Sequence, residues 1–307
     1  MIDRRRVMRL APAALALLGA TVVLVGCATE PEQDSPGAAA SAPEAFQHIH
    51  SLVADPEQGE LLVGAHAGLY DLALEDSGTA TAEGPIGGLD FDPMGFTMQG
   101  DIAYASGHPG PTTPASFGSP NLGLIKSTDR GQTWSNVSLT GQTDFHDLAV
   151  GPQATGGGGG TIYGLDTSKP ALQLSFDGGV TWSDGAELVA RDIIAHPAVP
   201  GTVYATTQDG FAVSTDDGAT FAVDADAPPL FLAGIDSGTG AIAGIDTSGT
   251  VWAQDAAGTW VSGGAVSGNP QAFTVSGDRI FVADDRGIAF TDDIGVSWTV
   301  LEVTEHE

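Results

Sequence analysis

The apolar residues of this chain fall in short runs, and the polar residues between the runs are of the kinds that form turns. Runs such as 102–105 (IAYA) and 202–205 (TVYA) combine β-branched, aromatic and small apolar residues, and Gly, Asp, Ser and Pro separate them. Short runs with regularly spaced turn signals are typical of β-strands, and almost no helical period is present. The pattern therefore predicts an all-β domain.

Aligned on their turns, the runs form six units of four strands each. The first strands of the six units are expected to start at His48, Met94, Phe145, Arg191, Leu230 and Ala272. Units of this kind bury their apolar faces only against their neighbours. We therefore predict a six-bladed β-propeller over residues 45–307, in which the first unit is the most degenerate. Because each blade takes its four strands consecutively, we expect no exchanged strand to close the ring.

One short motif, called the repeated motif below, occurs at the same place in four units. It reads S/T-x-D-x-G-x-T/S followed by Trp or Phe, at residues 127–134, 175–182, 214–221 and 291–298, and a worn copy lies at 255–260. Its Asp can accept hydrogen bonds from turn amides, and its Gly can take a positive φ. The repeated motif is thus expected to form the turn between the third and fourth strands.

The repeated motif resembles the Asp box (BNR repeat) of the sialidase superfamily. Other segments, including the lipobox described below and 47–52 (QHIHSL), look like those of actinobacterial exported lipoproteins that carry a glycosylhydrolase-like label. The first resemblance implies a propeller with Asp-box turns, and the second implies an exported, glycosylhydrolase-like protein. Such folds carry many activities, so the resemblance alone assigns none.

Sialidase activity is disfavoured by the arginines. Members of that family resemble one another in three arginines that bind the substrate carboxylate. After residue 27 this chain has only Arg130, Arg191, Arg279 and Arg286. Arg130 lies inside a repeated motif and Arg279 starts a second strand, so both are expected on the face opposite the substrate site.

The first 27 residues are predicted to be a lipoprotein export signal. Four arginines precede an apolar run, and 24–27 (LVGC) matches a bacterial lipobox. Cys27 is the only cysteine and is the expected lipidation site. The Arg-rich start also resembles a twin-arginine signal, and an ordinary basic n-region is the alternative. Residues 28–44 read as a disordered tether, so we expect an extracytoplasmic propeller anchored to the cell membrane.

Charge excludes one class of partner. Removal of residues 1–27 takes away four arginines and Asp3, which leaves 6 basic and 38 acidic side chains and a formal charge of −32. Such a surface repels nucleic acid and anionic lipid headgroups. The charge is compatible with a carbohydrate or protein ligand. It also keeps the protein soluble.

Five of the seven histidines are predicted to gather on one face of the propeller. The starts of first strands and the ends of second strands lie on the same channel face, and these positions hold His48, His50, His66, His108 and His146. Imidazole groups suit zinc or copper, and Met94 nearby favours copper. We therefore predict a metal site formed by at least three of these histidines. The alternative is a polar lining of the channel mouth without a metal.

Four carboxylates near the same face are candidates for catalysis: Asp144, Asp147, Asp166 and Asp192. A glycosidase needs two carboxyl groups roughly 5 to 10 Å apart. The Pro- and Gly-rich segment 108–121 starts beside His108 and is expected to be a lid or specificity loop, or else a surface insertion. The favoured function is a surface-anchored binding module, and the alternative is a glycoside hydrolase.

Overall fold

The computed structural model describes residues 46, 48–55, 58–75, 77–152 and 160–305. These belong to a compact unit that spans Ala40–Glu307. The predicted signal (1–27), with Cys27, and the whole of the predicted tether (28–44) lie outside the described residues. Within the described residues, no helix has the length and apolar character needed to cross a membrane.

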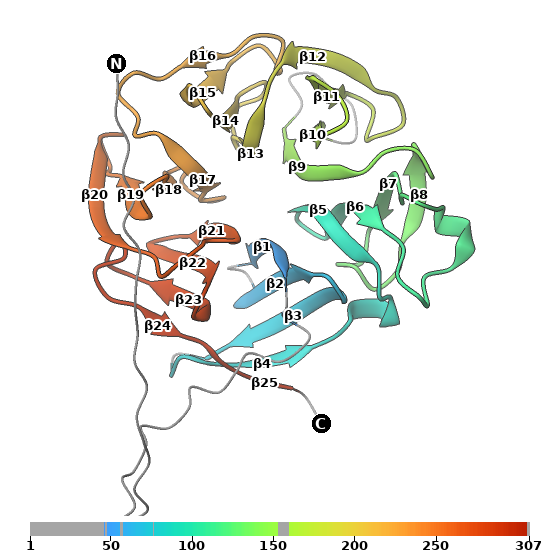
Figure 1. The fold of residues 1–307 in the computed structure, drawn as a ribbon, viewed down its shortest axis with the longest axis horizontal. Coiled ribbons are helices and arrows are strands. Elements are labelled where there is room, and N and C mark those ends of the chain that lie inside the picture. Colours follow the sequence, from blue (N-terminus) through green and yellow to red (C-terminus); the bar gives the residue numbers. More distant parts are fainter. Residues whose placement is uncertain (1–45, 47, 56–57, 76, 153–159, 306–307) are drawn as a thin grey trace, which may run out of the picture. The chain divides into compact units, whose positions relative to one another are not determined.

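Six sheets, whose consecutive strands pair antiparallel, surround a central axis and form a six-bladed β-propeller, as predicted (Figure 1). Blade one contains β1 (Ile49–Asp55), β2 (Glu60–Ala65), β3 (Gly68–Leu74) and β4 (Thr79–Glu83). Blade two contains β5 (Asp92–Gln99), β6 (Ile102–His108), β7 (Leu124–Ser127) and β8 (Ser135–Ser138). Blade three contains β9 (Phe145–Gly151), β10 (Thr161–Asp166), β11 (Ala171–Ser175) and β12 (Ser183–Glu187).

The second half of the ring repeats the same order. Blade four contains β13 (Ala190–Ala195), β14 (Val203–Thr207), β15 (Gly210–Ser214) and β16 (Ala222–Val223). Blade five contains β17 (Leu230–Ile235), β18 (Ile242–Asp246), β19 (Thr250–Gln254) and β20 (Trp260–Ala265). Blade six contains β21 (Ala272–Ser276), β22 (Arg279–Asp284), β23 (Gly287–Thr291) and β24 (Thr299–Val300). The 3-10 turn η2 (Ile86–Gly88) lies between β4 and β5, and the 3-10 turn η3 (Ala115–Phe117) lies between β6 and β7.

The first strand of each blade lies nearest the axis. Each of these strands contacts the first strands of both neighbouring blades, so β1 contacts β5 on one side and β21 on the other. Apolar side chains of adjacent blades pack between the sheets; Leu61 and Val63 of blade one, for example, share a buried cluster with Phe281 of blade six. The apolar faces of the blades are thus buried against one another, which closes the ring.

The expectation that no strand is exchanged is wrong. The C-terminal strand β25 (Glu302–Glu305) pairs in parallel with β4, with Val303 opposite Ala80, so the last strand of the chain completes the outer edge of the first blade. Leu301 is buried just before it, and Glu302 N donates a hydrogen bond to Gly78 O (3.0 Å). The sequence of β25 is EVTE, and a strand with one apolar residue gives almost no periodic signal.

The four complete copies of the repeated motif form the same turn between the third and fourth strands. In the copy at 175–182, Ser175 Oγ donates to Asp177 Oδ1 (2.9 Å) and accepts from Gly179 N (2.8 Å). Thr181 donates its N–H to Asp177 Oδ1 (2.8 Å) and its hydroxyl to Asp177 Oδ2 (2.6 Å). Such acceptance stabilises the ionised form, and it lowers the pKa of the equivalent Asp216 and Asp293 to about 2.

The repeated motif therefore serves the fold and lies away from the predicted site. The residue before each motif glycine adopts a left-handed conformation in all four copies, whether it is Arg130, Gly178, Asp217 or Ile294. Arg130 also forms ion pairs with Asp55 and Glu60, at the far ends of β1 and β2 from the histidines. This pairing ties the motif of blade two to blade one.

Candidate functional site

A β-bulge occurs at the same place in the innermost strand of five blades. The strand pairing skips one residue near the start of β1, β5, β9, β13 and β17. The skipped residues are His50, Met94, His146, Arg191 and Phe231. Because a bulged residue has no ladder partner, its side chain can turn away from the regular alternation, and bulges are frequent beside functional sites.

A second set of equivalent residues on the channel face lies two residues before the bulge residue of each blade. It includes His48 in blade one, Asp92 in blade two and Asp144 in blade three, and each of these faces the end of the second strand of the same blade. His66 N donates to His48 O (3.2 Å), and Asp92 is the strand partner of His108. The histidines of the predicted cluster thus occupy equivalent positions in successive blades.

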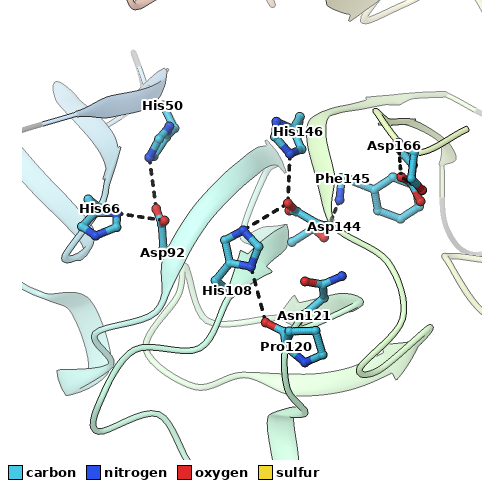
Figure 2. Close-up of polar contacts among 12 residues, drawn as sticks. His50, His66, Asp92, His108, Pro120, Asn121, Asp144, Phe145, His146 and Asp166 are labelled. Carbon is cyan, nitrogen blue, oxygen red and sulfur yellow. Dashed lines mark hydrogen bonds and ion pairs between the residues drawn. The ribbon is translucent and has the colours of Figure 1, made fainter.

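Two histidines and one aspartate form what we call the His50 cluster: His50, His66 and Asp92. Asp92 Oδ2 lies 2.9 Å from His66 Nδ1, and Asp92 Oδ1 lies 3.1 Å from His50 Nε2 (Figure 2). One donor atom from each of the three residues lies within 4.8 Å of the other two. Asp92 is buried, while 68% of the His66 side chain is exposed, so the cluster is open to solvent on one side.

Two buried atoms of the His50 cluster face each other without forming a hydrogen bond. His50 Nε2 and Asp92 Oδ1 are within ion-pair distance, yet neither has an aligned hydrogen-bond partner. Although burial raises the pKa of Asp92, the neighbouring imidazoles of His50 and His66 lower it below the ordinary value. The carboxylate therefore stays ionised and can accept a cation.

The other two channel-face histidines converge on Asp144, and we call His108, Asp144 and His146 the His108 cluster. Asp144 Oδ2 lies 2.9 Å from His146 Nε2 and 3.2 Å from His108 Nε2 (Figure 2). The hydrogen bond to Asp144 raises the pKa of His146. His108 Nδ1 lies 3.4 Å from the carbonyl oxygen of Pro120, in the segment that follows β6.

Four of the five predicted histidines are thus divided between two centres. His48 belongs to neither; its ring lies edge-on to that of His66, with 6.4 Å between the centroids, and its backbone has a left-handed φ of 57°. Met94 is the half-buried bulge residue of β5.

Asp92 was missed at the level of sequence. The first strand of blade two was expected to start at Met94, whereas β5 starts at Asp92. Pro93 lies inside this strand, and proline within a run argues against a strand. The alignment of the six units could have identified Asp92, because it occupies the same position in blade two as His48 in blade one and Asp144 in blade three.

Asp147 and Asp192 follow the bulges of blades three and four, and their carboxyl groups hydrogen-bond to each other. Asp147 Oδ2 accepts from Ile193 N (2.6 Å), and Asp192 Oδ2 accepts from Ala233 N (2.8 Å). Burial raises the pKa of both groups, and the adjacent charge of Asp192 raises that of Asp147 further. The pair thus favours retention of a proton, and it links blades three, four and five.

The remaining catalytic candidate is part of a turn. Asp166 is buried at the end of β10, and its Oδ1 accepts from the N–H (2.9 Å) and the hydroxyl (2.5 Å) of Ser168. The four predicted carboxylates therefore have different surroundings. Asp144 lies between two histidines, Asp147 and Asp192 pair with each other, and Asp166 holds a turn.

A channel runs through the propeller along the first strands and has a volume of about 810 Å³. His50, His146 and Arg191 line its histidine end, together with the Asp147–Asp192 pair, and Asp55 and Arg130 line the opposite end. The Arg191 guanidinium lies 5.5 Å from the ring of Phe231, the next bulge residue. Arg279 and Arg286 form ion pairs with Asp292 and Asp284.

The long segment after β6 is tied to the propeller. Asp90 accepts hydrogen bonds from Thr112 N (2.8 Å) and from the Thr113 hydroxyl (3.0 Å). Asn121 donates its side-chain N–H to Gln142 O (3.1 Å) at the other end of the segment. These contacts favour a fixed wall beside His108 over a lid that opens and closes.

Comparison with known proteins defines the class of this protein. No protein-family model matches the chain. A curated xyloglucanase of Hypocrea jecorina (strain QM6a) is 30% identical over 164 residues, which are 52% of this chain and 17% of the relative. The solved family 74 (GH74) xyloglucanase of Xanthomonas campestris matches with a TM-score of 0.52 at 16% identity, over 83% of this chain and 45% of that one. A structure of YCF48 bound to D1 peptide matches with a TM-score of 0.45 at 17% identity, over 83% of this chain and 81% of that one.

The protein is therefore a six-bladed β-propeller with structural neighbours among family 74 xyloglucanases. The chain spans less than half the length of either xyloglucanase. A structural likeness at this identity shows the fold and does not carry over an activity. The resemblance to the sialidase superfamily and to exported lipoproteins remains a prediction from the sequence.

Proposed function

We propose that this protein is a lipid-anchored, extracytoplasmic binding module that holds a transition metal at the His50 cluster. The observation that supports it most directly is the contact between His50 Nε2 and Asp92 Oδ1. These two buried atoms lie 3.1 Å apart without an aligned hydrogen bond. Buried polar atoms that pair in poor alignment are incompletely satisfied, and a shared cation would satisfy both of them.

The spacing of the donor atoms fits one metal ion. Zinc binds imidazole nitrogen and carboxylate oxygen at about 2.0–2.2 Å, so neighbouring donors around one ion are roughly 3.0–3.5 Å apart. The two nitrogen–oxygen separations in the His50 cluster are 2.9 and 3.1 Å. A small outward movement of the exposed His66 ring would let a single ion contact all three residues.

The donor set selects the class of metal. Two imidazoles and one carboxylate suit zinc or copper, whereas magnesium and calcium prefer oxygen donors alone. His48, next to His66, is the nearest further imidazole for a fourth position. Solvent or a ligand with a donor atom can take that position instead, as in open metal sites.

Metal binding is tested on the full-length chain produced without a polyhistidine tag. Elemental analysis after dialysis, and titration with Zn²⁺ and Cu²⁺, are compared for the native chain and for His50→Ala/His66→Ala. The double variant is expected to lose one equivalent of bound metal per chain. The control is His196→Asn. His196 lies outside the channel face, in a turn in which its Nδ1 accepts hydrogen bonds from the backbone amides of Ala198 and Val199.

The result that counts against the metal site is equal metal content in the native chain and the double variant. His50→Gln/His66→Gln repeats the comparison with side chains that keep polar atoms and volume. Circular dichroism of each variant confirms that the loss of metal is not a loss of fold.

Lipid anchoring at Cys27 is a separate part of this proposal, supported by the lipobox at 24–27. Mass spectrometry of the protein from the membrane fraction of the producing bacterium should find a diacylglyceryl-modified Cys27 as the first residue. Cys27→Ala should leave the protein without lipid. A native chain that retains residues 1–26 and carries no lipid contradicts the anchor.

The similarity to a xyloglucanase supports glycoside hydrolysis as a second candidate function. A glycosidase needs two catalytic carboxylates that are separated from each other, and the candidates Asp147 and Asp192 do not meet this requirement because they are close enough to share a proton. That is closer than the roughly 5–10 Å that glycosidases use. Release of reducing sugar from xyloglucan, lost in Asp147→Asn or Asp192→Asn but kept in the His50→Ala/His66→Ala variant, would favour this candidate over metal binding.

A further inference from the structure

The His108 cluster repeats part of the His50 cluster one blade further round the ring. In both, a histidine at the end of a second strand meets an aspartate at the start of the next blade. His66 of blade one meets Asp92 of blade two, and His108 of blade two meets Asp144 of blade three. Asp92 and His108 are direct strand partners, so the two clusters are adjacent.

The contact with Pro120 determines the tautomer of the neutral His108 ring. A carbonyl oxygen can only accept, so His108 Nδ1 must donate in its contact with Pro120 O. In the neutral ring, Nε2 then carries a lone pair and faces Asp144 Oδ2, another acceptor, at 3.2 Å. Two acceptors that face each other at this distance repel unless a proton or metal ion lies between them.

The same arrangement is common around bound metals. A metal-binding histidine usually donates its second ring N–H to a backbone carbonyl or a carboxylate, which orients the ring and fixes its tautomer. The carbonyl of Pro120 is in the segment that Asp90 and Asn121 tie to the propeller. The orientation of His108 is thus set by the fold.

Asp144 offers an acceptor atom that nothing in the described structure uses. Its Oδ1 is buried without a hydrogen-bond partner, and only 13% of the side chain is exposed. Its Oδ2 lies 2.9 Å from His146 Nε2 and 3.2 Å from His108 Nε2. Each of these nitrogen–oxygen separations is near that of neighbouring donors around one ion, roughly 3.0–3.5 Å. The three donor atoms do not converge as closely as those of the His50 cluster, because the two histidine nitrogens lie on different sides of the oxygen.

We propose that His108, Asp144 and His146 form a second transition-metal site, so that one chain binds two ions at adjacent positions of the channel face. The metal class, zinc or copper, rests on the proposed function, because both clusters offer two imidazoles and one carboxylate. Both rings of the His108 cluster point at one carboxylate oxygen (Figure 2). One of these two part-exposed rings must therefore turn before a single ion can contact all three residues.

The number of bound ions tests the second site separately from the first. Zn²⁺ per chain is measured by elemental analysis after equilibrium dialysis against a stated free Zn²⁺ concentration. The proteins are the untagged full-length chain, the single variants His66→Ala and His108→Ala, their combination His66→Ala/His108→Ala, and the His196→Asn control. The expected values are two ions for the native chain and the control, one for each single variant and none for the double variant.

Each other outcome identifies which proposal fails. One ion in the native chain, lost in His66→Ala and kept in His108→Ala, overturns the second site and leaves the first. One ion lost only in His108→Ala overturns the first site and supports the second. No bound ion in the native chain overturns both.

A conservative variant separates a metal ligand from a structural residue. Asp144→Asn keeps the shape of the side chain but removes the charge that attracts the ion. It should lower the Zn²⁺ affinity of the His108 cluster at least tenfold while the circular dichroism spectrum stays native. Unchanged affinity in this variant overturns the proposal. With Cu²⁺ in place of Zn²⁺, electron paramagnetic resonance should show two nitrogen-coordinated copper signals in the native chain and one in His108→Ala.

Discussion

Asp147 and Asp192 show how one residue position links neighbouring blades. Each follows a bulge and accepts a backbone N–H from the first strand of the next blade, and the two carboxyl groups share a hydrogen bond. Two such groups cannot both ionise at low cost, because like charges at hydrogen-bond distance repel. The folded state therefore favours a proton on this pair at a higher pH than the unfolded chain does.

This proton predicts a pH dependence of stability. The pKa values of the pair are raised in the folded state, so their stabilisation is complete below the ordinary aspartate pKa of about 3.9. It is lost as pH rises through the raised folded pKa. The free energy of unfolding should fall over this interval by about 1.4 kcal/mol for each unit by which the pKa is raised.

Thermal unfolding of the native chain and Asp147→Asn between pH 4 and pH 8 measures this effect. The amide cannot titrate, so the melting temperature of the variant relative to the native chain should rise with pH. Asp177→Asn is the matched control, because that aspartate lies in a repeated motif, where hydrogen bonds lower its pKa. Parallel pH profiles for the native chain and Asp147→Asn would contradict a shared proton.

The residues of the site differ in how far the sequence could predict them. The histidines could be placed because the repeats align, and the strand pairing puts them in equivalent positions. Their division between two carboxylates depends on side-chain directions at bulges, and a bulge leaves no period in the sequence. Asp92 was missed because the neighbouring Pro93 argued against a strand at that position. The Asp147–Asp192 contact joins two blades, and the sequence pattern within one blade does not tell how close its side chains come to those of the next blade.

At the scale of strands and turns, the sequence was most informative where turn chemistry recurs. The repeated motif placed four turns correctly, because its aspartate, glycine and hydroxyl residues each make a defined hydrogen bond. The closing strand was missed because β25 is short, polar and paired with the far end of the chain. Long-range pairing of that kind leaves no local signal.

The closing strand predicts a loss of stability on truncation. Removal of residues 302–307 exposes the edge of β4 and the apolar cluster against which Val303 packs. We expect the melting temperature to fall by about 5–10 °C, which corresponds to roughly 2–3 kcal/mol for a domain of this size. Differential scanning calorimetry measures it.

A chain that lacks only residues 306–307 is the control, because it retains β25. Its melting temperature should be close to that of the full-length chain. Equal melting temperatures for the control and the longer truncation would show that β25 does not hold the ring closed.

At the scale of the whole molecule, the two clusters lie across seams between blades. His66 and Asp92 join blades one and two, and His108 and Asp144 join blades two and three. The strong negative charge of the chain, formally −29, also draws cations toward the protein. A bound ion should therefore stabilise the ring as well as fill the site.

Metal addition should raise the melting temperature. A ligand at 100 times its dissociation constant stabilises the folded state by about 2.7 kcal/mol, which is about 5–10 °C for a propeller of this size. Calorimetry of the dialysed full-length chain with and without Zn²⁺ measures the shift, and EDTA should reverse it. His50→Ala/His66→Ala should show a smaller shift, and an unchanged shift in that variant would place the stabilising ion elsewhere.

The bulge of the innermost strand has one more consequence. Its residue has no ladder partner, so strand pairing places little demand on its identity, and five blades hold an imidazole, a thioether, a second imidazole, a guanidinium and a phenyl ring there. The propeller thus separates the residues that pair within its sheets from the five that bulge out of the innermost strands. Related rings could acquire new specificities by exchanging these five side chains alone, while the strands around them stay as they are.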